Sequence, residues 1–210
     1  MTLARMIRVN KVPSSFSLPG LRPMEERDVL SVADLFMRYM KRFGMSPLFN
    51  LEEIKHQFLS GNGTGAIGDG GVGRRKGQVT WSYVVEVVSV LSSFPSSLAN
   101  YTWLYQNRET HRITDFFSFY SLPSTVINST KYPILEAAYL FYYASDVAFQ
   151  DGADEGSRLK KRLEAMVGDA LVVANEAKFD VLNALTLMDN ASILHDLKVR
   201  FPTYLLKQDD

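Results

Sequence analysis

The stretch ITDFFSFYS at residues 113–121 decides the fold of this chain, because aromatic and β-branched residues at this density favour a β-strand. The run VTWSYVVEVV at residues 79–88 has the same character, and we expect the two strands to pair as a hairpin. Side chains alternate between the two faces of a strand, which separates one set, Phe116, Ser118 and Tyr120, from the other, Phe117 and Phe119.

Helical periodicity lies on both sides of this strand pair. Apolar residues recur at three- and four-residue steps over residues 25–43 and again over 158–177, and each pattern predicts an amphipathic helix. Gly44 is expected to cap the first helix and Lys178 to close the second.

The remaining predicted elements complete a mixed architecture. They are a short helix opened by the capping box of Asn50 and Glu53 and ending near Phe58, strands at 135–147 and 179–185, and a helix at 189–197 capped by Asp189 or Asn190. The order helix, helix, three strands, helix, strand, helix predicts an α/β (α+β) domain with a central mixed sheet flanked by helices.

The domain organisation has one main body with three unusual segments. We expect residues 1–23 to be an extended lead-in and residues 24–198 to form the domain, with a glycine-rich loop at 61–77. Residues 87–107, Ser-rich and apolar together, resemble neither a tight turn nor a solvated loop, and are interpreted as an atypical insertion between the paired strands. Residues 199–210 form an atypical tail.

The glycine-rich loop contains GDGGVG at residues 68–73, which matches the GxGxxG pattern of dinucleotide sites. Such a fingerprint follows a buried strand and opens a helix, because the helix N-terminus binds the pyrophosphate. Here the pattern follows Gly, Asn and Thr residues and leads into a strand. The context therefore favours a flexible loop over a phosphate site.

Composition narrows the classes of function. The chain has 210 residues, and its 23 Lys and Arg balance 23 Asp and Glu, so nucleic acid is disfavoured as a partner. There is no cysteine, and the three histidines, His56, His111 and His195, lack metal-ligand spacing, so we expect no metal site. No signal peptide and no transmembrane segment are predicted, and we expect a soluble, cytoplasmic protein.

Aromatic residues are concentrated in two of the predicted strands. They could line a ligand groove or simply form the core of the sheet, and composition alone leaves both interpretations open. The set comprises Phe116, Tyr120, Tyr139, Phe141, Tyr142 and Tyr143.

Several long blocks resemble one known family. LPGLRPMEERDV, VTWSYVVE, TDFFSFYSLPST, LEAAYLFYY and KFDVLNALTLMDN resemble the C-terminal half of glycylpeptide N-tetradecanoyltransferase (N-myristoyltransferase), above all in filamentous fungi. The resemblance covers most of residues 1–86 and 108–198. It implies a GNAT-like fold, one half of a two-half enzyme that transfers myristoyl from myristoyl-CoA to the N-terminal glycine of proteins.

The resemblance also implies a set of peptide-binding residues. Ser124 and Asn183 would hydrogen-bond the substrate, while Tyr120, Tyr139 and Leu185 would shape its pocket. The partners implied are Gly-initiated protein N-termini and a separate acyl-CoA-binding half. Myristoyl-CoA would act as a co-substrate through that other half, and no cofactor would be bound permanently.

The chain departs from the family in ways that bear on catalysis. The resemblance places the oxyanion donors in the N-terminal half, which we expect to be missing, and the catalytic base at a C-terminal carboxylate, which the tail VRFPTYLLKQDD displaces. We therefore assign no catalytic residue, although Asp209, Asp210 and the new terminal carboxylate are an alternative base. Both discontinuities begin with valine, at Val87 and Val199, and valine codons start with GT as intron donors do, so translated intron sequence is one hypothesis.

Three functions follow from these observations. The first is an N-myristoyltransferase of which this chain supplies the peptide-binding half. The second is a catalytically incomplete fragment or pseudoenzyme that only binds peptide. The third, a generic GNAT-like acetyltransferase, lacks the required phosphate loop before a helix.

Overall fold

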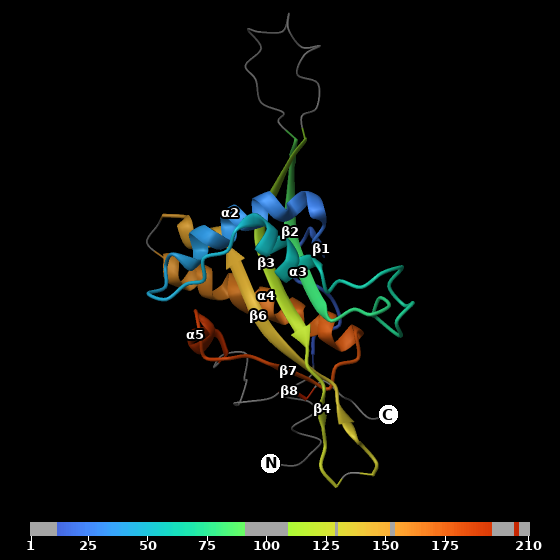
Figure 1. Cartoon of the computed structure of the whole chain (residues 1–210). Coiled ribbons are helices and arrows are strands. Elements are labelled where there is room, and N and C mark those ends of the chain that lie inside the picture. Colours follow the sequence, from blue (N-terminus) through green and yellow to red (C-terminus); the bar gives the residue numbers. More distant parts are fainter. Residues whose placement is uncertain (1–11, 91–108, 129, 152–153, 195–203, 206–210) are drawn as a thin grey trace, which may run out of the picture.

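A six-stranded mixed sheet forms the centre of the molecule (Figure 1). Its strand order is β1 (Leu21–Pro23), β2 (Thr80–Val90), β3 (Glu109–Ser121), β6 (Ala137–Ser145), β7 (Val181–Asn183) and β8 (Tyr204–Leu205). All neighbouring strands are antiparallel except β6 and β7, which are parallel. The computed structural model describes residues 12–90, 109–128, 130–151, 154–194 and 204–205.

The predicted hairpin of β2 and β3 is confirmed, and it is longer than expected. Thr80 pairs with Tyr120 at one end and Val90 with Glu109 at the other. Residues 87–90 of the expected insertion thus continue β2, because three of the four are valine, a residue type that favours strands. Residues 91–107 of that insertion lie outside the described residues.

Helices cover both faces of the sheet. One face carries the 3₁₀ turn η1 (Glu26–Asp28), α2 (Val29–Met40) and α3 (Leu51–Leu59), and the other carries the long helix α4 (Glu155–Glu176). The capping box of α3 is confirmed, since the Asn50 side chain accepts a hydrogen bond from the Glu53 N–H and the Glu53 carboxylate accepts one from the Asn50 N–H. The architecture therefore confirms the predicted mixed α/β class.

The helix ends differ in how well they were predicted. Lys178 has a φ of 60° and turns the chain after α4, as expected of a closing residue. The prediction that Gly44 caps the first helix is wrong, because α2 ends at Met40 with Lys41 still in the right-handed helical region.

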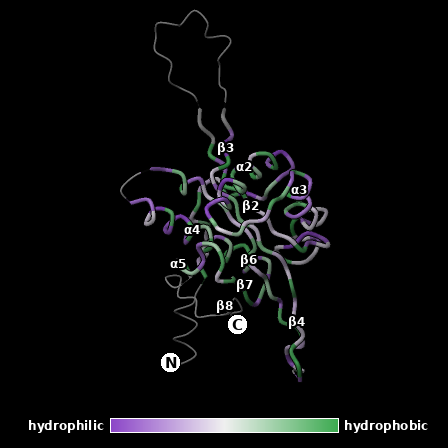
Figure 2. Tube along the Cα trace, turned by 60° about the vertical axis from the view of Figure 1, so that its left-hand side comes forward, coloured by the Kyte–Doolittle hydropathy of each residue, from purple (hydrophilic) through white to green (hydrophobic). Residues whose placement is uncertain are grey.

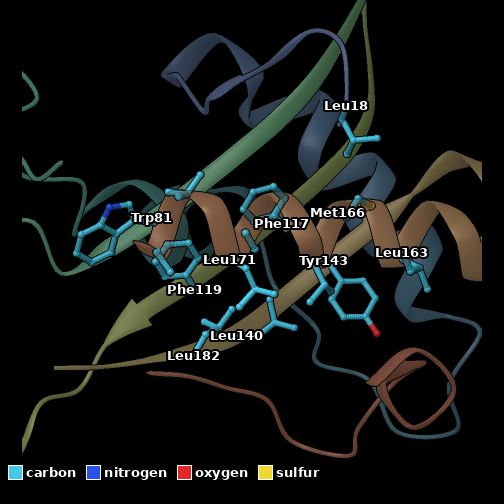
Figure 3. Close-up of a cluster of buried hydrophobic side chains, with 14 of the residues drawn as sticks. Leu18, Trp81, Phe117, Phe119, Leu140, Tyr143, Leu163, Met166, Leu171 and Leu182 are labelled. Atoms are coloured by element: carbon cyan, nitrogen blue, oxygen red, sulfur yellow. The ribbon is translucent and has the colours of Figure 1, made fainter. Parts of the chain in front are cut away.

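Two apolar cores lie on opposite faces of the sheet, as the alternation in β3 predicts. Phe117 and Phe119 belong to the core under α4, with Trp81, Leu163 and Met166 (Figure 3). On the other face, Phe116 packs with side chains of α2 and α3, among them Phe36, Ile54 and Phe58. The strand is buried on both faces, so apolar residues occupy both sets of its alternating positions.

Two segments outside the predicted helices and strands contribute edge strands. Leu21–Pro23 pairs with β2 as β1, so the expected irregular lead-in ends in a strand. Tyr204 and Leu205, within the atypical tail, pair with β7 as β8. Neither strand was predicted from the sequence. Each has only two or three residues, and its conformation depends on pairing with a strand that is distant in the sequence or follows another element.

A buried carboxylate of α4 binds the lead-in. Asp169 accepts hydrogen bonds from the Ser17 N–H at 2.7 Å, the Ser17 hydroxyl at 2.9 Å and the Leu18 N–H at 3.0 Å. Because Asp169 is buried, these three donors satisfy a carboxylate that would otherwise destabilise the fold.

The glycine-rich loop packs against the C-terminal end of α4. The Arg74 guanidinium donates to the Ala177 carbonyl at 2.6 Å and lies 4.3 Å from the centre of the Phe179 ring. A cation is favoured there because the last carbonyls of a helix carry partial negative charge. At Gly73, with a φ of 69°, a Cβ atom would lie 2.1 Å from the Glu176 carbonyl oxygen.

A buried ion pair joins α4 to β3. Asp115, with 0% of its surface exposed, accepts two hydrogen bonds from Arg162, at 3.0 and 2.5 Å, and one from the Ser145 hydroxyl at 2.6 Å. The carboxylate is thus on the α4 face, away from Ser118 and Tyr120.

A second charged cluster lies where β1 meets β2. Arg22 binds the Asp28 carboxylate at 2.7 and 2.8 Å and the Glu86 carboxylate at 2.5 Å. The hydrogen bond from Arg22, opposed by burial, holds the pKa of Glu86 below its ordinary value.

None of the helices in the described ranges has the length and apolar content needed to cross a bilayer.

Candidate functional site

Three of the predicted site residues form a row across adjacent strands. Tyr120 on β3 is the register partner of Tyr139 on β6, and Tyr139 is the register partner of Asn183 on β7. The two tyrosine rings stack, with centroids 5.7 Å apart and planes at 17°. Residues paired in register project to the same face of a sheet, so segments separated by more than sixty residues meet here.

The row continues into a band of aromatic side chains. The Phe141 ring meets the Tyr120 ring edge-on, with centroids 5.4 Å apart, and lies 4.2 Å from the Tyr142 ring. The register shifts opposite Ser118, so that β6 carries two residues there, Phe141 and Tyr142, where β3 carries one. Both rings therefore pack toward the core of α2 and α3.

The row is half-buried rather than closed. Tyr120, Tyr139 and Asn183 each have intermediate exposure, whereas Phe116, four residues before Tyr120 on β3, is fully buried beneath α2 and α3. Two half-exposed phenol rings beside an amide provide apolar surface together with hydrogen-bonding groups, which is a combination that suits an extended polar ligand.

Ser124 and Leu185 lie on segments that continue from the row. Ser124 is the exposed first residue of β4 (Ser124–Thr125), which pairs with β5 (Ile134–Leu135) in a hairpin that extends away from the sheet (Figures 1 and 2). Leu185 is 63% exposed and follows Asn183 by two residues. The structure therefore brings Tyr120, Tyr139 and Asn183 together and leaves these two outside the stacked row.

A hydrogen-bond network behind the row was missed by sequence reasoning. Asp189 and Asn190, expected as helix caps of α5 (Asn190–Leu194), use their side chains elsewhere: the Asp189 carboxylate accepts from Tyr39 and Arg42, and the Asn190 amide bonds Tyr143 and the Leu185 carbonyl. Burial, followed by the bond to Asp189, raises the pKa of Tyr39 far above its ordinary value. The only signal in the sequence was two adjacent polar residues ending an apolar block.

Two other hollows on the described surface do not include the predicted residues. An open groove between α2 and α3 is lined by Leu30, Met37, Phe49, Leu51 and Ile54 among others. A smaller hollow beside β2 includes Gln78 and Ser82, whose buried hydroxyl has no hydrogen-bond partner. Within the described ranges no three His, Asp or Glu side chains are grouped to hold a metal ion.

The mixed sheet, with α2 and α3 on one face and α4 on the other, is the GNAT-like α/β half-domain of an acyltransferase. The family model of the myristoyl-CoA:protein N-myristoyltransferase C-terminal domain matches residues 1–97 and 95–205. The chain therefore belongs to the N-myristoyltransferase family. The two matched segments meet inside the expected insertion at 87–107.

Curated relatives carry the same family name. The chain is 43% identical over 197 residues to glycylpeptide N-tetradecanoyltransferase of Aspergillus fumigatus, and the match covers 94% of this chain and 33% of that protein. It is 42% identical over 188 residues to the Schizosaccharomyces pombe enzyme, covering 89% of this chain and 34% of the relative. The chain thus spans about a third of the length of these relatives.

Solved structures give the same result. The Saccharomyces cerevisiae N-myristoyltransferase with bound myristoyl-CoA superposes with a TM-score of 0.72 at 37% identity, covering 94% of this chain and 39% of that one. A second structure of the yeast enzyme, with myristoyl-CoA and inhibitors, gives a TM-score of 0.74 at 36% identity, covering 97% and 40%.

Proposed function

We propose that this chain supplies the peptide-binding half of a glycylpeptide N-tetradecanoyltransferase, an enzyme that transfers myristoyl from myristoyl-CoA to the N-terminal glycine of proteins. The observation that carries the proposal is the row of Tyr120, Tyr139 and Asn183 across β3, β6 and β7. Membership of the family and the bound myristoyl-CoA in the yeast relative support it.

The proposed roles follow from the chemistry of each side chain. The stacked rings of Tyr120 and Tyr139 form the wall of a groove, because large rigid rings supply contact area at little cost in conformational entropy. Asn183 and the exposed hydroxyl of Ser124 hydrogen-bond the backbone of the Gly-initiated peptide, and Leu185 bounds the pocket beyond Asn183. No metal or nucleic acid takes part in this proposal.

The transfer itself needs groups that we do not assign to this chain. The glycine amine loses a proton to a base and attacks the thioester carbonyl, an amide bond forms, and the carbon–sulfur bond breaks to release the CoA thiol. N–H donors must stabilise the oxyanion of the intermediate. In our proposal a separate acyl-CoA-binding half holds myristoyl-CoA as co-substrate, and the reaction takes place in the cytoplasm.

A second candidate function is a catalytically incomplete fragment that only binds peptide. This function requires only the row of Tyr120, Tyr139 and Asn183, because peptide binding alone needs no acyl-CoA site. Both candidates predict that the purified chain binds a Gly-initiated peptide.

One experiment tests both candidates. The chain is mixed with labelled myristoyl-CoA and a fluorescent Gly-initiated peptide, and acyl transfer and peptide anisotropy are measured in parallel, with the N-acetylated peptide as control. Transfer supports the enzyme, and binding without transfer supports the fragment. Equal affinity for the free and the acetylated peptide would exclude a groove for N-terminal glycine.

A further inference from the structure

The loop between β7 and α5, residues 184–189, joins two of the proposed peptide contacts to the rest of the fold. It begins directly after Asn183 and contains Leu185, whose side chain is exposed. A loop that presents ligand contacts needs a fixed backbone, since each misplaced contact loses its geometry. Two residues fix this loop in the described structure: Asp189, its last residue, and Asn190, the residue that follows.

The Asn190 side chain forms the first anchor. Its Nδ2 donates to the Leu185 carbonyl at 2.7 Å, and its Oδ1 accepts from the Tyr143 hydroxyl at 2.9 Å. Asn190 is only 4% exposed, and Tyr143 lies in the core beneath α4 (Figure 3). A carboxamide supplies a donor and an acceptor at once, so this single side chain links the loop backbone to the sheet.

Asp189 forms the second anchor and connects the loop to α2. Its carboxylate accepts from the Tyr39 hydroxyl at 2.5 Å and from Arg42 at 3.0 Å, while its backbone N–H donates to the Tyr143 hydroxyl at 3.2 Å. The Tyr143 hydroxyl therefore serves both anchors, donating to Asn190 and accepting from Asp189.

The loop also contains a backbone conformation that requires support. Met188 has a φ of 56°, which side-chain-bearing residues adopt rarely and only where the surroundings enforce it. Met188 packs against both apolar cores, directly before the two anchors.

We propose that Asn190 is a positioning residue of the peptide groove, which holds the Leu185 carbonyl so that the loop presents Asn183 and Leu185 in a fixed geometry. This inference rests on the proposed function. Asn190 itself does not touch the peptide, because its amide is occupied by the loop and the core.

The test uses the full chain labelled with ¹⁵N. In Asn190→Ala we expect backbone order parameters of residues 184–188 to fall from about 0.85 to below about 0.6. Tyr143→Phe keeps the core ring while removing the hydroxyl that both anchors share, and it should give a smaller fall in the same segment. Ser192→Ala, which loses only a hydrogen bond to the Asp189 carbonyl, is the matched control and should leave the order parameters unchanged.

Affinity for a Gly-initiated peptide is measured on the same samples. We expect the affinity to fall at least about fivefold in Asn190→Ala, because a loosened loop must lose conformational entropy when it binds the peptide. In Ser192→Ala the affinity should remain unchanged. Unchanged order parameters in both Asn190→Ala and Tyr143→Phe would overturn the positioning role. So would a loosened loop that binds the peptide with unaltered affinity. If the unmodified chain binds no peptide, the proposed function fails, and the order parameters still decide whether Asn190 holds the loop.

Discussion

Tyr120 and Tyr139 lie opposite each other on β3 and β6, and their rings stack with centroids 5.7 Å apart. If these rings form the wall of the peptide groove, Tyr139→Ala should weaken binding of a Gly-initiated peptide about tenfold or more, as truncation of a central aromatic contact does. Tyr139→Phe keeps the ring and should bind within about threefold of the unmodified chain, on the scale where about 1.4 kcal/mol is tenfold. Fluorescence anisotropy measures both.

Phe149→Ala is the matched control for this prediction. Phe149 is an exposed aromatic residue of η3 (Asp146–Phe149) that contacts Arg38 and lies outside the aromatic row. Its removal should leave peptide affinity unchanged. An equal loss of affinity in Phe149→Ala and Tyr139→Ala would show that the effect is not specific to the row.

Gly73 and Gly77 allow the contact between the glycine-rich loop and α4 to be measured. Both have a φ near 70°, but a Cβ at Gly73 meets the Glu176 carbonyl, whereas a Cβ at Gly77 meets no atom within 4 Å. Gly77→Ala should therefore lower the free energy of unfolding by only about 1–2 kcal/mol, which is the strain of a left-handed conformation in a residue with a Cβ. Gly73→Ala should cost clearly more in urea unfolding, and equal losses would mean that the loop does not need this close approach.

Arg162 should be essential to the stability of the domain. Arg162→Met leaves the buried Asp115 carboxylate without its charged partner, and we expect the free energy of unfolding to fall by about 3–5 kcal/mol. The exposed neighbour Lys161 provides the control, since Lys161→Met should change it by no more than about 0.5 kcal/mol. Urea unfolding of the two variants gives the comparison, and similar losses would contradict the role assigned to the ion pair.

The Glu86 carboxylate should make stability depend on pH. Its folded-state pKa lies below the ordinary value of about 4.3, because Arg22 binds the charged form. A lowered carboxyl pKa stabilises the fold fully above the unfolded value, and this contribution is lost as pH falls through the folded value. The stability difference between the unmodified chain and Glu86→Gln should therefore shrink as pH falls below about 4. Growth of the difference below that pH would contradict the expected sign.

Much of the architecture was predictable because local patterns and long-range packing agree. The alternation in β3 predicts that Phe116 and Phe117 lie on opposite faces of the sheet, and each face is covered by helices. The capping box at Asn50 is equally local, so its residues define a helix start whatever lies around them. The edge strands β1 and β8 escaped prediction because each has two or three residues, whose conformation depends on the strand beside them.

The candidate site divides in the same way. Tyr120, Tyr139 and Asn183 were predicted through a resemblance of motifs, and only the register of three strands shows that they meet. The anchoring role of Asn190 left no pattern, because its partners Leu185 and Tyr143 are five and 47 residues away and one of them is a backbone carbonyl. Hydrogen bonds to backbone atoms place no demand on the residue type of the acceptor.

The bond between Ser17 and Asp169 has a consequence for the synthesis of the chain. The two residues are 152 positions apart, and at about 5–20 residues per second a ribosome needs roughly 8–30 seconds to make the intervening segment. Until then Ser17 and Leu18 lack the carboxylate that binds them, so this contact is a late step of folding that follows synthesis of α4.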